Sequence, residues 1–249
     1  MPSAKKRKLS EHVYNIDTAN PHPRLPICLC VDTSSSMLGH PIRELNSGMR
    51  HFYKSLSRNN ETKYTADIAV VTFGCDGVRC IQEFAQIYEG ISPPKLEADG
   101  MTPMGEAVNL SLDLIEQRRR NYLELNIRHY HSMLIIMADG KTKGNSDELI
   151  RAAERVRNFE NQNKLFVIAI GVGNEADMHA LSQFSTKVEP VKLKGLNFMS
   201  FFKWLIVSVE ETAAGSPENG NGLYIKQQAD SLADWIDGSW NDFRQNKYK

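Results

Sequence analysis

The chain has 249 residues, of which 41% are hydrophobic and 24% are charged, as is ordinary for a globular protein. Its 30 Lys and Arg residues balance its 30 Asp and Glu residues, so overall charge gives no reason to expect nucleic acid or an anionic membrane as a partner. No apolar run approaches the roughly 20 residues of a membrane-spanning helix, and the N-terminus lacks the apolar segment of a secretory signal. We therefore expect a cytoplasmic protein that binds neither nucleic acid nor membrane.

Apolar runs and alternating patterns predict six strands. They cover residues 25–31, 64–73, 78–87, 132–138, 165–171 and 188–193. Apolar residues at helical spacing predict helices that begin near residues 41, 103, 146, 176 and 197. Because strands and helices alternate, we expect a mostly parallel sheet with helices on both faces.

One pair of predicted strands breaks this alternation. Only Gly74-Cys75-Asp76-Gly77 separates them, and four turn residues cannot hold a parallel crossover. The two strands should therefore form an antiparallel hairpin, with the second strand at or near an edge of the sheet. The expected fold is α/β and Rossmann-like: a doubly wound, mostly parallel six-stranded sheet with one antiparallel hairpin strand.

Three local expectations concern the helices. The helix that begins near Pro103 is expected to fray through Arg118-Arg119-Arg120, a basic run that we interpret as solvated surface. Ser146 is expected to cap the helix that follows the 132–138 strand, and Asn197 to cap the last helix of the domain.

The composition also suggests how the chain is divided. Residues 1–22 are polar and aperiodic and are expected to be a flexible leader, followed by one domain over residues 23–212. Residues 213–222 have the composition of a flexible linker. Residues 223–249 are expected to form an amphipathic appendage, which folds back onto the domain or docks on a partner.

The most informative stretch follows the first predicted strand. An apolar run ends in Asp32, Ser34 and Ser36, which place a carboxylate and two hydroxyls at alternate positions. Oxygen ligands of this kind suit a small, hard divalent cation.

Two distant segments supply further oxygen ligands. Asp139 directly follows the 132–138 strand, and Thr102 lies in a glycine-flanked turn before a helix. In an open α/β sheet, ligands bind outside the carboxyl ends of the strands, where the strand order reverses. We therefore predict that Asp32, Ser34, Ser36, Thr102 and Asp139 converge on one metal ion. An all-oxygen set favours Mg²⁺, with Mn²⁺ or Ca²⁺ as alternatives.

These residues resemble a known motif. Asp32-Thr33-Ser34-Ser35-Ser36, together with Thr102 and Asp139-Gly140, is similar to the metal-ion-dependent adhesion site (MIDAS) of von Willebrand factor type A (VWA) domains. The resemblance extends over about residues 24–212. It implies that Ser34, Ser36 and Thr102 bind the ion directly, and that Asp32 and Asp139 bind it directly or through water.

Other segments are similar to the bacterial TerY-like (YegL-like) branch of that family, which is associated with tellurite and chemical-stress resistance. They are Arg24-Leu25-Pro26, Asp32 to Ile42, Gly171-Val172-Gly173, Ala176-Asp177-Met178 and Phe201-Phe202-Lys203-Trp204. This resemblance implies an adaptor in a stress-response system with kinase-like or phosphatase partners. The chain departs from the family pattern at Ser35, where glycine is common, and at Ala138, where threonine is usual. Neither departure removes a ligand.

The predicted function is non-enzymatic: Mg²⁺-dependent binding of a protein partner whose Glu or Asp completes the coordination of the ion. The first alternative is a Mg²⁺-dependent phosphohydrolase, because bound Mg²⁺ can polarise a phosphoryl oxygen, but the sequence offers no general base to accompany it. Ser34 stands where a phosphoaspartyl-transfer enzyme needs a second acid, and Ile135 occupies the place of the leading glycine of a P-loop. The second alternative is a metal that only stabilises the fold.

Overall fold

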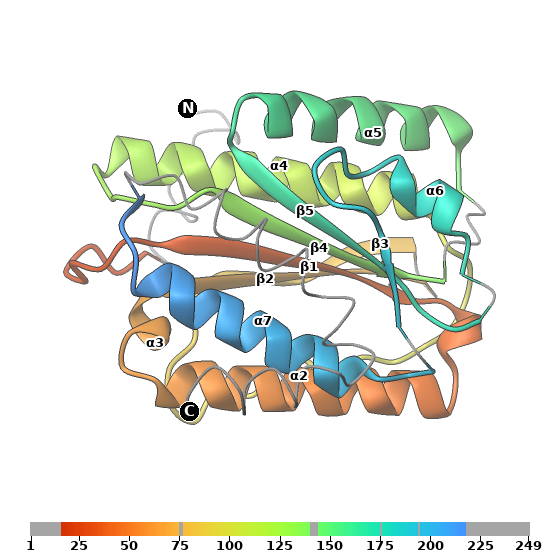
Figure 1. Ribbon diagram of the computed structural model, residues 1–249, viewed down its shortest axis with the longest axis horizontal. Coiled ribbons are helices and arrows are strands. Elements are labelled where there is room, and N and C mark those ends of the chain that lie inside the picture. Colours follow the sequence, from red (N-terminus) through yellow and green to blue (C-terminus); the bar gives the residue numbers. More distant parts are fainter. Residues whose placement is uncertain (1–15, 75–76, 140–143, 175, 194, 218–249) are drawn as a thin grey trace, which may run out of the picture.

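A computed structural model describes residues 16–74, 77–139, 144–174, 176–193 and 195–217. They form one sheet between two layers of helices (Figure 1). The strands are β1 (Leu25–Thr33), β2 (Ala66–Gly74), β3 (Gly77–Gln86), β4 (Ser132–Ala138), β5 (Leu165–Gly171) and β6 (Val191–Lys192). The helices are α2 (His40–Arg58), α3 (Thr62–Thr65), α4 (Met104–Glu124), α5 (Ser146–Asn161), α6 (Met178–Ser182) and α7 (Phe198–Ala213), with a 3₁₀ turn, η1, at Ser35–Met37.

The strand order confirms the predicted topology. The sheet has six strands in the order β3-β2-β1-β4-β5-β6. All neighbouring pairs are parallel except β2 and β3, which form the expected antiparallel hairpin at one edge. The chain leaves β1 toward β2 on one side and returns to β4 on the other. The strand order therefore reverses between β1 and β4, where ligands bind in folds of this class.

The central strands are buried along their whole length. Every residue of β1, β2, β4 and β5 is buried, as is typical of parallel strands that are covered on both faces. In Figure 1, α2, α3 and α7 lie on one side of the sheet and α4, α5 and α6 on the other. The apolar residues accordingly form two separate core clusters, one under each helical layer.

The second predicted strand begins later than expected. Tyr64 and Thr65 belong to α3, and β2 begins at Ala66. The cause is local, because the Asn59 side chain accepts hydrogen bonds from the backbone N–H groups of Glu61 and Thr62. Such a side-chain contact favours a helical turn over extended chain.

The prediction for the arginine run was wrong for the helix end and for Arg118, although Arg120 is exposed as expected. Helix α4 continues through it to Glu124, and Arg118 is buried rather than solvated. Its Nη2 lies 2.6 Å from Oδ2 of Asp67, at the start of β2. A buried carboxylate needs a cationic or hydrogen-bonding partner, and Arg118 supplies it across the helix–sheet contact.

The helix caps follow the prediction in part. Asn197 caps α7 as expected, by accepting from the Ser200 N–H. The cap of α5 is Asn145, whose side chain accepts from the Asp147 N–H, whereas Ser146 is the first helical residue. The helix expected to begin near residue 176 begins at Met178, after its cap Asp177, and ends at Ser182. The last strand is also shorter than 188–193 and contains two residues.

Both ends of the chain are described in part. Ile16 is buried, and the Arg24 guanidinium donates to the carbonyls of Asp17 and Asn20, so these residues contact the domain. Residues 1–15 and 218–249, which include the expected appendage, lie outside the described residues. Within the described part of the chain, no helix is both long enough and apolar enough to cross a membrane.

Candidate metal centre

The turn that follows Asp32 brings three of the predicted ligands together. Asp32 is 1% exposed, and its Oδ1 accepts a hydrogen bond from the Ser34 N–H at 2.7 Å. The chain then turns through η1, where the Met37 N–H donates to the Ser34 carbonyl. This turn places the hydroxyl oxygens of Ser34 and Ser36 2.9 Å apart.

Asp139 lies at the end of the neighbouring parallel strand. In β1 and β4, Val31 is paired with Met137, so both chains leave the sheet at the same edge. Burial raises the pKa of the Asp32 carboxyl from 3.8 to about 6; hydrogen bonds from Ser34 and from the Asp139 backbone act to lower it, and the negative charge of Asp139 acts to raise it. The two carboxylates are therefore close enough to interact, as the topology predicted.

One oxygen of Asp32 is left without a partner. Its Oδ2 is buried and accepts no hydrogen bond from any residue that the structure describes. An ionised carboxylate oxygen in this position is costly unless a cation or donor compensates it. The Asp32 side chain and its hydroxyl neighbours thus have the donor chemistry that a hard divalent cation requires.

Thr102 belongs to a loop that is tied to the Asp32 turn. The Ser35 N–H donates to the Gly100 carbonyl at 3.1 Å, and the Asp99 N–H donates to the Thr33 carbonyl at 2.8 Å. Thr102 is itself buried and lies two residues before α4 begins. The loop of Thr102, the third predicted hydroxyl ligand, is therefore held beside the Asp32 turn by backbone hydrogen bonds.

Two acidic residues support this arrangement in ways that the sequence did not reveal. Asp99 accepts from the Gly100 N–H at 2.7 Å and from the Ser35 hydroxyl at 3.4 Å. The Asp177 N–H donates to the Asp139 carbonyl at 2.9 Å. An acidic residue just before a helix marks a cap, but no pattern in the sequence indicates its partner.

The departure at Ser35 has a structural role. Its side chain bonds Asp99 rather than the hydroxyl pair of Ser34 and Ser36, so it leaves the ligand oxygens unobstructed. Among the described residues, no three His, Cys, Asp or Glu side chains gather as a metal-binding cluster. The candidate centre has only two side chains of these types, Asp32 and Asp139. Its other three predicted ligands are the hydroxyls of Ser34, Ser36 and Thr102.

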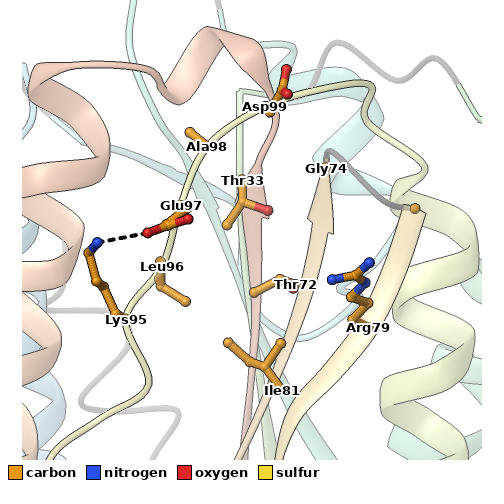
Figure 2. Close-up of a pocket in the computed structure, with 11 residues that line it drawn as sticks. Thr33, Thr72, Gly74, Arg79, Ile81, Lys95, Leu96, Glu97, Ala98 and Asp99 are labelled. Carbon is orange, nitrogen blue, oxygen red and sulfur yellow. Dashed lines mark hydrogen bonds and ion pairs between the residues drawn. The ribbon is translucent and has the colours of Figure 1, made fainter.

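A pocket of about 410 Å³ lies next to the candidate centre. Figure 2 shows it between the ends of β1, β2 and β3 and the loop of residues 95–99. Thr72 and Ile81 face Leu96 across the space, while Thr33 and Asp99 lie at the end nearest the metal centre. The pocket opens beside the predicted ligands and shares their loops.

Comparison with known proteins agrees with this fold. A family model described as von Willebrand factor type A domain matches residues 27–198. No curated protein sequence matches the chain.

Two solved structures have the same fold at low sequence identity. Proximal thread matrix protein 1 from the mussel byssus is 17% identical, with a TM-score of 0.52, over 77% of this chain and 49% of the other. The pilus adhesin SpaC from Lactobacillus rhamnosus GG is 11% identical, with a TM-score of 0.57, over 75% of this chain and 30% of the other. The chain thus matches about half of the first structure and less than a third of the second.

Proposed function

Because this chain belongs to the von Willebrand factor type A domain family, we propose that it is a non-enzymatic module that binds a protein partner through a divalent metal ion. Asp32, Ser34, Ser36, Thr102 and Asp139 would hold the ion. A Glu or Asp of the partner would complete its coordination. The ion is Mg²⁺ in this proposal, with Mn²⁺ or Ca²⁺ as alternatives.

The observation that carries the proposal is the unpartnered Oδ2 of Asp32. It is buried beside the paired hydroxyls of Ser34 and Ser36, and the Asp139 carboxylate is close enough to raise the pKa of Asp32. Two mutually repelling carboxylates next to hydroxyl oxygens are stabilised by a bound cation. This supports a metal role over a purely structural polar cluster.

The charge of the site supports an acidic ligand. A divalent cation would offset the charges of Asp32 and Asp139, which leaves the loaded centre near neutral and able to accept another anionic oxygen. Mg²⁺ retains water at positions that the protein does not fill, and such a position is open to exchange with a carboxylate. One of the solved structures that this chain resembles is a pilus adhesin, and an adhesion role is compatible with binding rather than turnover.

The narrower context rests on resemblance to the TerY-like branch. On that basis we place the module in the bacterial cytoplasm, as an adaptor in a tellurite-resistance or stress-response system. Its partners would be kinase-like or phosphatase proteins of the same system. Copurification from a bacterial host with and without EDTA, followed by identification of the retained proteins, tests this part separately from metal binding.

Isothermal titration of Mg²⁺ into the purified chain tests the shared premise. We expect a saturable heat for the wild type, little heat for Asp32→Ala, and wild-type heat for Asp147→Asn. Asp147 is an exposed acidic residue in the first turn of α5, so it is a matched control for the loss of one charge. Equal heats in all three proteins would contradict the proposal.

Two further measurements separate binding from the alternatives. In an assay of phosphate release from generic phosphoesters, we expect no Mg²⁺-dependent turnover by the wild type. The Asp32→Ala variant should therefore give the same background rate. If the metal only stabilised the fold, EDTA would lower the melting temperature and leave the retained partners unchanged. Metal-dependent turnover without a metal-dependent partner would favour the phosphohydrolase.

A further inference from the structure

A cluster of cations lies at the edge of the sheet opposite the candidate metal centre. It consists of Arg119 in α4, His129 and His131 just before β4, and Lys187 between α6 and β6. Burial lowers the pKa of the His131 imidazole, and the positive charges of Arg119, Lys187 and His129 lower it further. These four side chains, which we name the basic edge, are therefore close enough for their charges to repel one another.

Arg119 differs from the arginines on either side of it in what it contacts. Arg118 and Arg120 each form an ion pair with a carboxylate, whereas Nη1 of Arg119 donates to the Lys164 carbonyl at 3.2 Å. Lys187 also donates to a neutral group, a side-chain amide oxygen, at 3.0 Å. Among the residues that the structure describes, neither Arg119 nor Lys187 forms an ion pair with an acid. The basic edge therefore has positive charge that an acidic ligand would neutralise.

An exposed leucine adjoins these cations. Leu123 is 66% exposed and follows Arg119 by four residues in the same helix, so the two side chains lie on one face of α4. A single exposed leucine is common on protein surfaces. Beside a group of cations, however, it fits a ligand that has carboxylates next to apolar side chains.

The described part of the chain ends close to the basic edge. The hydroxyl of Tyr130, which lies between the two histidines in sequence, donates to the Gly215 carbonyl at 2.9 Å. Tyr130 packs in the core cluster under α2 and α7, whereas His129 contacts Tyr122 of α4, with ring centroids 5.3 Å apart. In Figure 1, the blue end of α7 and the C-terminal end of α4 lie at the same edge of the sheet. The chain thus leaves the domain at this edge, on the other side of the sheet from Arg119.

The sequence that follows has the matching charge. Residues 227–243, which we name the acidic segment, contain four aspartates and no Lys, Arg or His. Three of these, Asp230, Asp234 and Asp237, recur at the spacing of one helical face. Apolar residues recur at the spacing of the adjoining face, at positions Ala229, Leu232, Ala233, Ile236 and Trp240. The acidic segment therefore combines the two features that the surface around Arg119 and Leu123 fits.

The chain between Gly215 and the acidic segment is long enough to reach this surface. Extended chain spans at most about 3.3–3.6 Å per residue. The eleven residues 216–226 therefore reach much farther than the roughly 10 Å that separates packed layers. A segment tethered this close has a high effective concentration at the surface, which favours it over a separate acidic partner.

We propose that the acidic segment docks on the basic edge of the same chain. Its aspartates face the cations, and its apolar side covers Leu123. The inference goes beyond the proposed function and does not depend on it, because the basic edge and the candidate metal centre lie at opposite ends of the strands.

Amide hydrogen exchange of the full chain tests the proposal. The wild type is compared with an edge variant, Arg119→Glu/Lys187→Glu, a segment variant, Asp230→Lys/Asp234→Lys, and a charge-swapped protein that has all four substitutions. The control is Arg43→Glu/Arg50→Glu, which reverses two exposed charges on α2, in the helical layer on the other face of the sheet. Exchange in β4 and β5 shows whether the domain of each protein is folded.

Amides of residues 227–243 are expected to exchange slowly in the wild type and in the control. In the edge and segment variants their exchange should accelerate about tenfold, because two attractive charge pairs at a partly screened surface become repulsive. The charge-swapped protein should return to the wild-type rate. About 1 M NaCl should accelerate exchange in the wild type as well, since the Debye length is then only about 3 Å. The segment variant changes no residue of the domain, so it tests the proposal even if the edge variant is less stable.

Three results would overturn the proposal. Exchange of the acidic segment in the wild type at the rate of free chain would show that it does not dock. Acceleration in both variants without recovery in the charge-swapped protein would place the segment on another surface. Protection that falls on dilution, together with a dimer in sedimentation velocity, would show that the segment docks on a second copy of the chain instead of its own domain.

Discussion

Arg118 and Asp67 form a buried ion pair, in which two guanidinium nitrogens lie 2.6 and 2.7 Å from the same carboxylate oxygen. Their side chains are 6% and 0% exposed, and the Tyr122 hydroxyl donates to the same oxygen. The pair joins α4 to the start of β2, where Asp67 is the second residue. It therefore fixes this helix on the sheet at the end away from the candidate metal centre.

Arg118→Met is expected to lower the free energy of unfolding by about 3–5 kcal/mol, because it leaves the Asp67 carboxylate buried without its cation. Arg120→Met is the matched control. Arg120 pairs with Glu116 on the exposed face of the same helix, and such solvent-screened pairs contribute little to stability. Urea unfolding of both variants measures the difference. Similar losses in the two variants would mean that the buried pair contributes no more to the free energy of unfolding than the exposed pair does.

The sheet itself was predictable because its strands are continuous apolar runs. β4 and β5 match the predicted ranges at both ends, since turn or polar residues bound each run. The hairpin followed from the length of its turn, and the site of strand reversal followed from the hairpin. In contrast, Arg118 lies 51 residues from Asp67 along the chain, and a run of three arginines on its own suggests a solvated surface.

The candidate centre was predictable to a similar degree. The spacing of Asp32, Ser34 and Ser36 is local, and the approach of Asp139 follows from the parallel pairing of β1 with β4. Their role as metal ligands remains a prediction. The supports of the centre were not predictable, because Asp99 and Asp177 act through backbone groups of other loops. Such contacts depend on loop conformation, which a periodic pattern does not encode.

Asn46→Ala is expected to destabilise the loop of residues 91–99 more than the fold as a whole. The variant loses both hydrogen bonds to Leu96, which leaves buried backbone groups unpaired and costs about 1–3 kcal/mol. Amide hydrogen exchange at Leu96 to Gly100 should accelerate, while exchange in β4 and β5 changes only with global stability. Unchanged protection of the loop would show that other contacts hold it.

Gly105→Ala is expected to lower the free energy of unfolding by about 1–3 kcal/mol, as overpacking does in a close contact. A Cβ at Gly105 would lie 2.5 Å from the Leu149 backbone nitrogen, and backbone cannot move aside as a side chain can. The shift of α4 away from α5 would also displace Thr102, so the apparent Mg²⁺ affinity should weaken. Gly215→Ala, where the nearest atom is 3.4 Å away, is the control and should cost less than about 0.5 kcal/mol.

The raised pKa of Asp32 predicts how the metal-free protein responds to pH. The carboxyl titrates at about 6 in the folded state and at 3.8 when unfolded. Between these values the folded state holds more protons, so this group's contribution to stability is fully present below pH 3.8 and is lost as pH rises through 6. The loss amounts to about 3 kcal/mol by pH 7.5, from the difference between the two pKa values.

Asp32→Asn removes this dependence, since an amide has no proton to release in that range. In EDTA, the free energy of unfolding of the wild type relative to Asp32→Asn should therefore fall by about 2.5 kcal/mol between pH 4 and pH 7.5. Any cost of burying the amide is independent of pH and shifts the whole curve without changing its slope. Saturating Mg²⁺ should restore the wild type at pH 7.5 and leave Asp32→Asn unchanged, because the cation compensates the ionised carboxylate that burial disfavours. Urea titrations at four pH values, with and without Mg²⁺, measure both effects, and parallel pH curves for the two proteins would contradict the assignment of the raised pKa to Asp32.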